Sequence, residues 1–153
     1  MSESPRTSTL PCHVRLRLTD GKEIEGTVWL LADPSRESGF TPLEVILQDS
    51  KDFLFVGLDR GGNMLVARRQ IRYAEIPADS PGAPVDLPGG ASLDVLTLHL
   101  DSGEEITGVL RSVAPEGYER MSDVMNAQGP FISLGHGDKL VLVAKTRVVR
   151  VSF

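Results

Sequence analysis

Cysteine is nearly absent from this chain: Cys12 is the only one in 153 residues. A single cysteine cannot form an internal disulfide, so the fold is no disulfide scaffold and the composition is typical of a reducing compartment. Long hydrophobic runs are missing too, because no stretch approaches the roughly 18 apolar residues of a membrane helix. The start, Met-Ser-Glu-Ser-Pro, lacks the basic residues and apolar run of a signal peptide. We therefore expect a cytoplasmic protein with no membrane partner.

The chain is also poor in aromatic residues and has no excess of positive charge. It contains one Trp, two Tyr and five Phe, which is few for a surface that stacks on bases. Its formal net charge is −5, so it lacks the overall basic footprint that attracts nucleic acids. Both observations argue against nucleic-acid binding, but they leave local basic patches open.

The two halves of the sequence resemble each other. In both, alternating apolar residues lead into a turn with Gly, followed by Glu-Ile, one further residue and Gly. The matching blocks, which recur in the same order, are 14–28 with 96–110, 53–56 with 131–134, and 64–71 with 141–148. Self-similarity of this kind predicts that one module has been duplicated.

A segment rich in proline and glycine separates the halves. Residues 77–91 contain four prolines and three glycines and show no apolar periodicity, which is typical of a linker. Residues 1–11 are similarly polar and predict a flexible tail. The predicted organisation is therefore tail 1–11, first module 12–76, linker 77–91 and second module 92–153.

Each module begins with the pattern of a β-hairpin. Val14, Leu16 and Leu18 alternate with polar residues, as in a strand with one buried face. The turn that follows contains Gly21, or Gly103 in the second module, and the second strand contains Gly26 or Gly108. A glycine inside a strand indicates a bulge, a sharp bend or a close approach of two backbones.

A short helix and three further strands complete each module. In Thr41-Pro42-Leu43-Glu44 the threonine can cap a helix, proline suits the first turn and glutamate can close a capping box. The second module has a helical spacing of apolar residues at Met121, Val124 and Met125. The remaining predicted strands, all short and rich in β-branched residues, are 53–58, 63–68, 70–75, 130–134, 140–145 and 147–152.

Five short, bent strands in about 60 residues bury their apolar face most economically by closing or nearly closing the sheet. The hairpin with Asp20-Gly21, or Asp101-Ser102-Gly103, followed by Gly26 or Gly108, resembles the Sm-like branch of the SH3-like small barrels. The resemblance implies a mainly β protein of two tandem five-stranded barrels, each with a short helix between its second and third strands.

Two stretches depart from the uridine-binding members of that family. These carry an Asp/Asn pair in the loop after the second strand, and neither 31–36 nor 112–117 contains one. They also carry an Arg-Gly or similar signature near the last hairpin, where this chain has 67–70 and 144–147. Uridine binding is therefore not implied.

The sequence offers no catalytic constellation. Cys12 and His13 are adjacent, so their side chains point to opposite faces of an extended strand. His136 lies in a predicted turn without spaced metal ligands, and the glycine-rich stretch 57–63 lacks the Lys and helix of a phosphate loop. We expect no enzyme activity, no cofactor and no metal.

One polar feature recurs in both halves, a group of basic residues after Val-Ala. Its members are Arg68, Arg69 and Arg72 in the first half and Lys145, Arg147 and Arg150 in the second. They form either a charged edge that blocks aggregation or a candidate interaction surface for acidic proteins or phosphates.

These observations favour a non-catalytic protein-interaction or scaffold module. Its partner is another protein or a second copy bound through unpaired strand edges. The alternative is an Sm-like RNA-binding protein that uses the basic strand edges.

Overall fold

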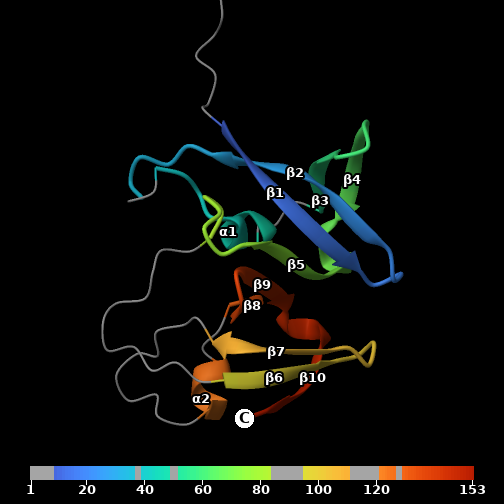
Figure 1. Ribbon diagram of the computed structural model, residues 1–153, viewed down its shortest axis with the longest axis vertical. Helices are drawn as coiled ribbons and strands as arrows, with labels where there is room; N and C mark the ends of the chain where they lie inside the picture. The colour runs from blue at the N-terminus through green and yellow to red at the C-terminus, as the bar shows by residue number, and fades with distance from the viewer. Residues whose placement is uncertain (1–8, 37–38, 49–51, 84–94, 111–120, 127–128) are drawn as a thin grey trace, which may run out of the picture.

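Ten antiparallel strands form one open sheet in this computed structural model, in the order β10-β6-β7-β8-β9-β5-β1-β2-β3-β4 (Figure 1). The structure describes residues 9–36, 39–48, 52–83, 95–110, 121–126 and 129–153. The strands of the first half are β1 (Thr9–Leu18), β2 (Glu23–Leu31), β3 (Phe53–Leu58), β4 (Asn63–Ala67) and β5 (Ile71–Pro77). Those of the second half are β6 (Val95–Leu100), β7 (Glu105–Leu110), β8 (Phe131–His136), β9 (Lys139–Ala144) and β10 (Val148–Ser152).

The two halves have the same strand order. The sheet runs β4-β3-β2-β1-β5 in the first half and β9-β8-β7-β6-β10 in the second. Each half also contains one short helix, α1 (Leu43–Leu47) or α2 (Met121–Asn126). A 3-10 turn joins the last two strands, η1 (Arg68–Gln70) in the first half and η2 (Lys145–Arg147) in the second. The mainly β prediction with two short helices is confirmed.

The halves are joined by a ladder between β5 and β9. Five residue pairs, from Tyr73↔Val143 to Pro77↔Lys139, place the two strands side by side in the middle of the sheet. Figure 1 shows the first half above this ladder and the second half below it.

The sheet is open, so the prediction of two closed barrels needs correction. β5 pairs with β1 on one side and with β9 of the other half on the other side. In a closed barrel the free edge of β5 would pair with a strand of the same half. Here β9 of the second half pairs with that edge, so the backbone groups of β5 have a partner strand on each side.

Of the three features that a glycine inside a strand indicates, a bulge, a sharp bend or a close approach of two backbones, the structure shows a close approach at both positions. A Cβ atom at Gly26 would lie 2.4 Å from the carbonyl oxygen of Gly57, and one at Gly108 would lie 2.6 Å from that of Gly135. In both halves the second strand therefore crosses the third at a point where no side chain fits.

Several element boundaries differ from the prediction. β1 begins at Thr9, inside the predicted tail, and its first residues pair with β2 at Leu31 and its neighbours. α1 has Pro42 rather than Thr41 as its N-cap, so the predicted threonine cap is wrong; proline has no side-chain acceptor, and no side-chain cap hydrogen bond forms. The Thr41 N–H donates to the carbonyl oxygen of Leu31, which ties the segment before the helix to the end of β2. The predicted linker begins with a packed turn, in which Gly82 lies against Cys12. Its residues 84–91, and residues 1–8 of the tail, lie outside the described part.

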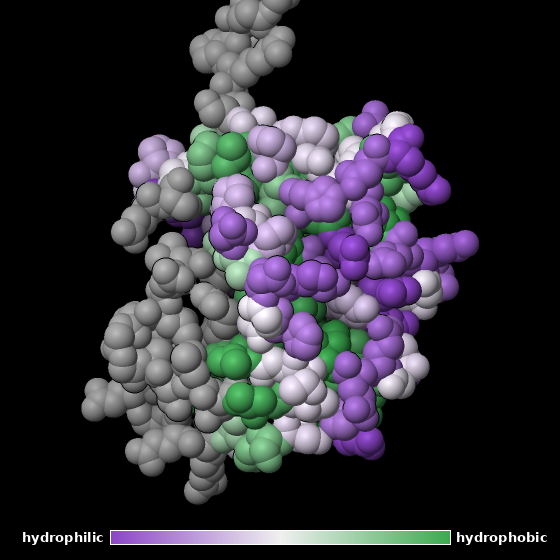
Figure 2. Space-filling model, viewed as in Figure 1, coloured by the Kyte–Doolittle hydropathy of each residue, from purple (hydrophilic) through white to green (hydrophobic). Residues whose placement is uncertain are grey.

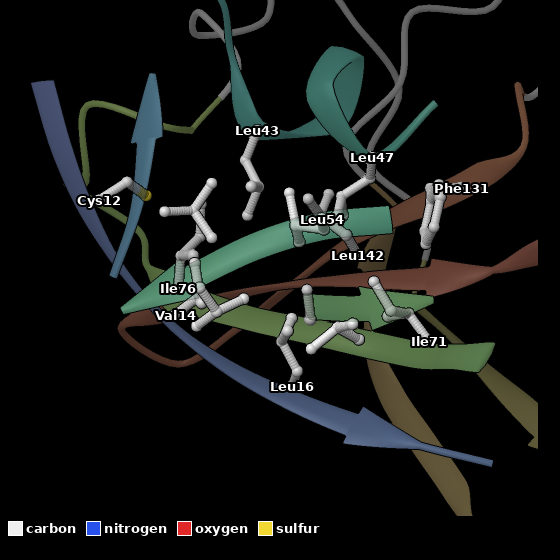
Figure 3. Packing of buried hydrophobic residues seen from close by; sticks show 14 of the residues in the cluster. Cys12, Val14, Leu16, Leu43, Leu47, Leu54, Ile71, Ile76, Phe131 and Leu142 are labelled. Carbon is white, nitrogen blue, oxygen red and sulfur yellow. The ribbon is translucent and has the colours of Figure 1, made fainter. Parts of the chain in front are cut away.

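Two clusters of buried residues make up the core. The buried residues of the second cluster all come from the second half, with Tyr73 of the first half packed against them, whereas the buried residues of the first cluster come from both halves. Phe131 and Leu142 reach it from β8 and β9 and lie beside Leu47, Leu54 and Ile71 (Figure 3). The interior of the first half is thus completed by the second. Among the described residues, no helix is long and apolar enough to cross a membrane.

Candidate interaction surface

Two of the six predicted basic residues join the halves. Arg72 is buried and forms an ion pair with Asp101, and its Nη2 also donates to the carbonyl oxygen of Thr19 at 3.2 Å. Arg147 lies 3.4 Å from the other oxygen of Asp101 and donates from Nη2 to the carbonyl of Arg69 at 3.1 Å. Asp101 therefore accepts hydrogen bonds from two guanidinium groups, one from each half. Hydrogen bonds between ionised partners are stronger than neutral ones.

A tyrosine adds a second polar link between the halves. The Tyr73 hydroxyl donates to Oε2 of Glu104 at 3.0 Å. Burial raises the pKa of Tyr73, so the phenol keeps the proton that this hydrogen bond uses.

Two further basic residues brace the helices. Arg68 donates from Nη1 to the carbonyl of Phe53 at 2.5 Å and from Nε to that of Ile46 at 3.1 Å. Lys145, its counterpart in the second half, donates from Nζ to the carbonyl of Asn126 at 3.3 Å. In each half a cation thus links the 3-10 turn to the end of the helix.

Arg69 and Arg150 are the exposed members of the basic group. The structure does not gather the six residues on one face, since four of them contact the interior of the molecule or the ends of helices. The candidate interaction surface that the sequence indicated is therefore divided among several places.

A row of exposed apolar side chains crosses β2, β3 and β4. The rings of Trp29 and Phe55 lie 5.9 Å apart at 47°, and Phe55 pairs with Leu65 across the β3–β4 ladder. Trp29 is 40% exposed, Phe55 48%, Leu65 64% and the neighbouring Phe53 56%. We call Trp29, Phe53, Phe55 and Leu65 the apolar row. A contiguous patch of large apolar side chains marks an interaction site on a soluble protein.

The sequence contains a signal for the apolar row that alternation alone did not show. In Phe53-Leu54-Phe55-Val56 both faces of the strand are apolar: Leu54 and Val56 are buried in the core, and the two phenylalanines point outward. A strand that is apolar on both faces is expected where both faces are buried. In β3 only the inner face is buried, and the two phenylalanines of the outer face are exposed to solvent.

The apolar row reaches an unpaired strand edge. Within the described sheet β4 and β10 are the terminal strands, each with one partner. Their free N–H and C=O groups can accept a further strand. Figure 1 shows β4 in the upper half of the molecule and β10 in the lower half, so one copy of the chain presents two separate edges.

Hydrophilic side chains cover most of the right-hand part of the face drawn in Figure 2, where the β1–β2 and β6–β7 hairpins project. On the β1–β2 hairpin Arg15 lies 3.2 Å from Glu23 and 3.0 Å from Glu25. Arg17 also lies 3.7 Å from Glu23, so two cations offset two carboxylates in this exposed group, which therefore offers no field of one sign to a charged ligand.

Cys12 and His13 point to opposite faces of β1, as predicted. Cys12 is buried, with its Sγ 3.4 Å from the hydroxyl oxygen of Ser80, and burial raises the pKa of the thiol. A buried thiol with a raised pKa is a poor nucleophile. His13 is exposed, and its Nε2 lies 2.7 Å from Oδ2 of Asp59. The pair cannot act as a catalytic dyad.

His13, Glu25 and Asp59 bring three possible metal ligands within 4.8 Å of one another. All three are exposed, and Glu25 is already paired with Arg15 while His13 is paired with Asp59. Metal-binding side chains are usually held in place by a second set of partners, whereas the contacts of these three side chains are with each other and with Arg15.

The other histidines also have partners. His99 lies 2.7 Å from the hydroxyl of Ser152 and 3.2 Å from Glu105, and Nδ1 of His136 lies 2.7 Å from the carbonyl oxygen of Thr107. The glycine-rich stretch 57–63 contains the β3–β4 hairpin turn, with Gly61 and Gly62 at positive φ.

Comparison of the chain with protein-family models, with curated proteins and with solved structures finds no match.

Proposed function

We propose that this protein is a non-catalytic scaffold that binds other polypeptides at its open sheet edges, and that its two halves are copies of one SH3-like, Sm-like module. The identical strand order of the halves and their matching sequence blocks support the duplication. The absence of a converging nucleophile, base and orienting group among the described residues supports the non-catalytic part.

The observation that carries the proposal is the position of the apolar row. Phe55 and Leu65 are a cross-strand pair next to the free edge of β4. A strand added to β4 would satisfy the backbone groups of that edge, and its side chains would cover part of the apolar row. Strand addition of this kind derives affinity from main-chain hydrogen bonds and specificity from the side chains beside them.

A photo-crosslinking amino acid at position 55 or 65, incorporated in the native cell, tests the proposal. We expect covalent adducts with protein from both positions. The matched control is position 95, because Val95 is also an exposed apolar residue on a strand, at 63% exposure, but lies in the other half. A second substitution at the edge, Leu65→Lys, should reduce the adducts formed from position 55.

Two results would contradict the proposal. One is labelling from positions 55 and 65 that is no stronger than from position 95. The other is nuclease-sensitive adducts, accompanied by binding of fluorescent oligouridine or oligoadenine to the purified protein at moderate salt. That second result would establish the RNA-binding alternative.

A further inference from the structure

The junction between the halves is a contact between two different edges of one module. Matching the sequence blocks makes β9 the counterpart of β4 and β10 the counterpart of β5. Within one chain, the β5 edge of the first half pairs with the β9 edge of the second half. The equivalent edges, β10 in the second half and β4 in the first, stay open in the described sheet. A head-to-tail contact of this type can be repeated from copy to copy.

The face that β8 and β9 present at the junction is the buried counterpart of part of the apolar row. Phe131 and Leu142 belong to the first core cluster and are buried there. Their counterparts in the first half are Phe53 and Leu65, which are largely exposed. The same strand face that is covered in the second half is therefore bare in the first.

The complementary side of the junction is less covered in the second half than in the first. Leu47, Ile71 and Ile76 are buried in the first core cluster, which Phe131 and Leu142 complete. Their counterparts are Met125, Val148 and Phe153. The first two are partly buried, and Phe153 is 82% exposed. Each half therefore has a side that is more exposed than its counterpart at the internal junction.

We infer that β10 of one copy adds to β4 of a second copy in the register of the β5–β9 ladder. In that ladder Ala74 lies opposite Leu142 and Tyr73 opposite Val143. Substituting the counterparts places Val151 opposite Leu65 and Arg150 opposite Val66. The inference rests on the proposed function and names a second copy of this chain as the polypeptide that the β4 edge binds.

The polar links of the internal junction are not reproduced between copies. The counterparts of Arg72 and Asp101 are Val149 and Thr19, which form no ion pair. The counterparts of Tyr73 and Glu104 are Arg150 and Lys22, two cations that would face each other across the contact. The contact between copies is therefore weaker than the one within a copy, and assembly depends on protein concentration and increases with salt, which screens the repulsion.

Cross-linking of purified protein tests the register. Two variants are mixed, both in a Cys12→Ala background that removes the only native thiol: one carries Val151→Cys and the other Leu65→Cys. Mild oxidation should give a covalent dimer containing one copy of each. The matched control replaces Val151→Cys with Ser152→Cys, because a shift of one residue turns the side chain to the other face of the strand. Equal yields from both mixtures, or no dimer from either, would overturn the inference.

Sedimentation of the purified full chain tests the contact independently. Lys22→Glu replaces the repulsion from Arg150 by an attraction and should tighten self-association by about twofold to tenfold at low salt. Leu65→Lys, at an exposed position that leaves the core intact, should leave only monomer. A wild-type protein that stays monomeric at millimolar concentration, with no effect of Lys22→Glu, would also overturn the inference.

The failures of the two proposals can be told apart. If the purified chain gives no dimer but photo-crosslinking from position 65 in cells still labels a different protein, the second copy is the wrong partner and the scaffold function stands. If neither experiment labels a polypeptide, both proposals fall.

Discussion

At the scale of single residues, two glycines carry an equal constraint in the two halves. Gly26→Ala and Gly108→Ala each place a methyl group against a backbone carbonyl, that of Gly57 or Gly135, which cannot rotate away. We expect each substitution to lower the free energy of unfolding by about 1–3 kcal/mol, as overpacking does. Urea denaturation measures the loss.

The matched control is Gly129→Ala, where a Cβ meets only the end of the Gln48 side chain, at 3.3 Å. This flexible side chain can move, so Gly129→Ala should have little effect. Losses of the same size at all three positions would show that the close approach of the backbones is not the cause.

The buried thiol of Cys12 predicts a pH dependence. Burial raises its pKa above the usual 9.0, so above pH 9 the unfolded chain releases a proton that the folded protein still holds. The folded state then binds more protons than the unfolded state, and stability falls as the pH rises from 9 towards the folded pKa. Urea midpoints measured from pH 8 to pH 10 report this slope.

A Cys12→Ala variant should show a flatter profile over the same range. The pKa of Tyr73 is also raised by burial, but Tyr73 is present in both proteins and cancels in their difference. Parallel profiles for the two proteins would mean that Cys12 titrates alike in the folded and unfolded chains.

At the scale of elements, the ion pairs of Asp101 hold the end of the β6–β7 hairpin against β5 and η2. Asp101→Asn removes the negative charge that faces the buried Arg72 and the partly buried Arg147. Because a buried cation is then left without its anion, we expect a loss of about 1–3 kcal/mol, reduced from the value for a fully buried pair by the exposure of Asp101.

A double-mutant cycle with Arg72→Leu separates this pair from general disruption. The double variant should be less destabilised than the sum of the single variants, since removing both charges leaves neither unpaired. For comparison, Asp33→Asn breaks the exposed pair with Arg36 and should cost well under 1 kcal/mol. Additive effects in the Asp101 cycle would exclude a direct coupling.

The elements themselves were largely predictable because their signals are local. Alternation at Val14, Leu16 and Leu18 and the glycines of the hairpin turns depend only on neighbours along the chain, and so do the helical spacings in α1 and α2. The 3-10 turns were missed because Arg68 and Lys145 are held by carbonyls that become neighbours only after folding.

The site was less predictable for a physical reason. A basic side chain looks the same in the sequence whether it faces solvent or a carboxylate brought from the other half, so the role of Arg72 at the junction could not be foreseen. The apolar row had a visible signal in Phe53-Leu54-Phe55-Val56, but that signal says only that a cover is needed. The pairing of β5 with β9 decides that the equivalent residues of the second half, Phe131 and Leu142, are covered while the apolar row of the first half is not.

At the scale of the whole molecule, the shared first core cluster makes the stability of one half depend on the other. Leu142 belongs to β9 in the second half but is fully buried in the first cluster. Leu142→Ala should therefore destabilise the first half by about 2–5 kcal/mol, the usual range for a buried leucine. Trp29 is the only tryptophan and packs against Phe55 in the first half, so its fluorescence reports the unfolding of that half alone.

Leu98→Ala is the matched control, since Leu98 is also fully buried but lies in the second cluster. If the halves unfold as one unit, both substitutions shift the fluorescence and circular dichroism transitions together, because the β5–β9 ladder must break in either case. If they unfold in steps, Leu142→Ala shifts the fluorescence transition more than Leu98→Ala does. A fluorescence midpoint that Leu142→Ala leaves unchanged would contradict a shared interior, and with it the geometric basis for a contact between copies that repeats the internal junction.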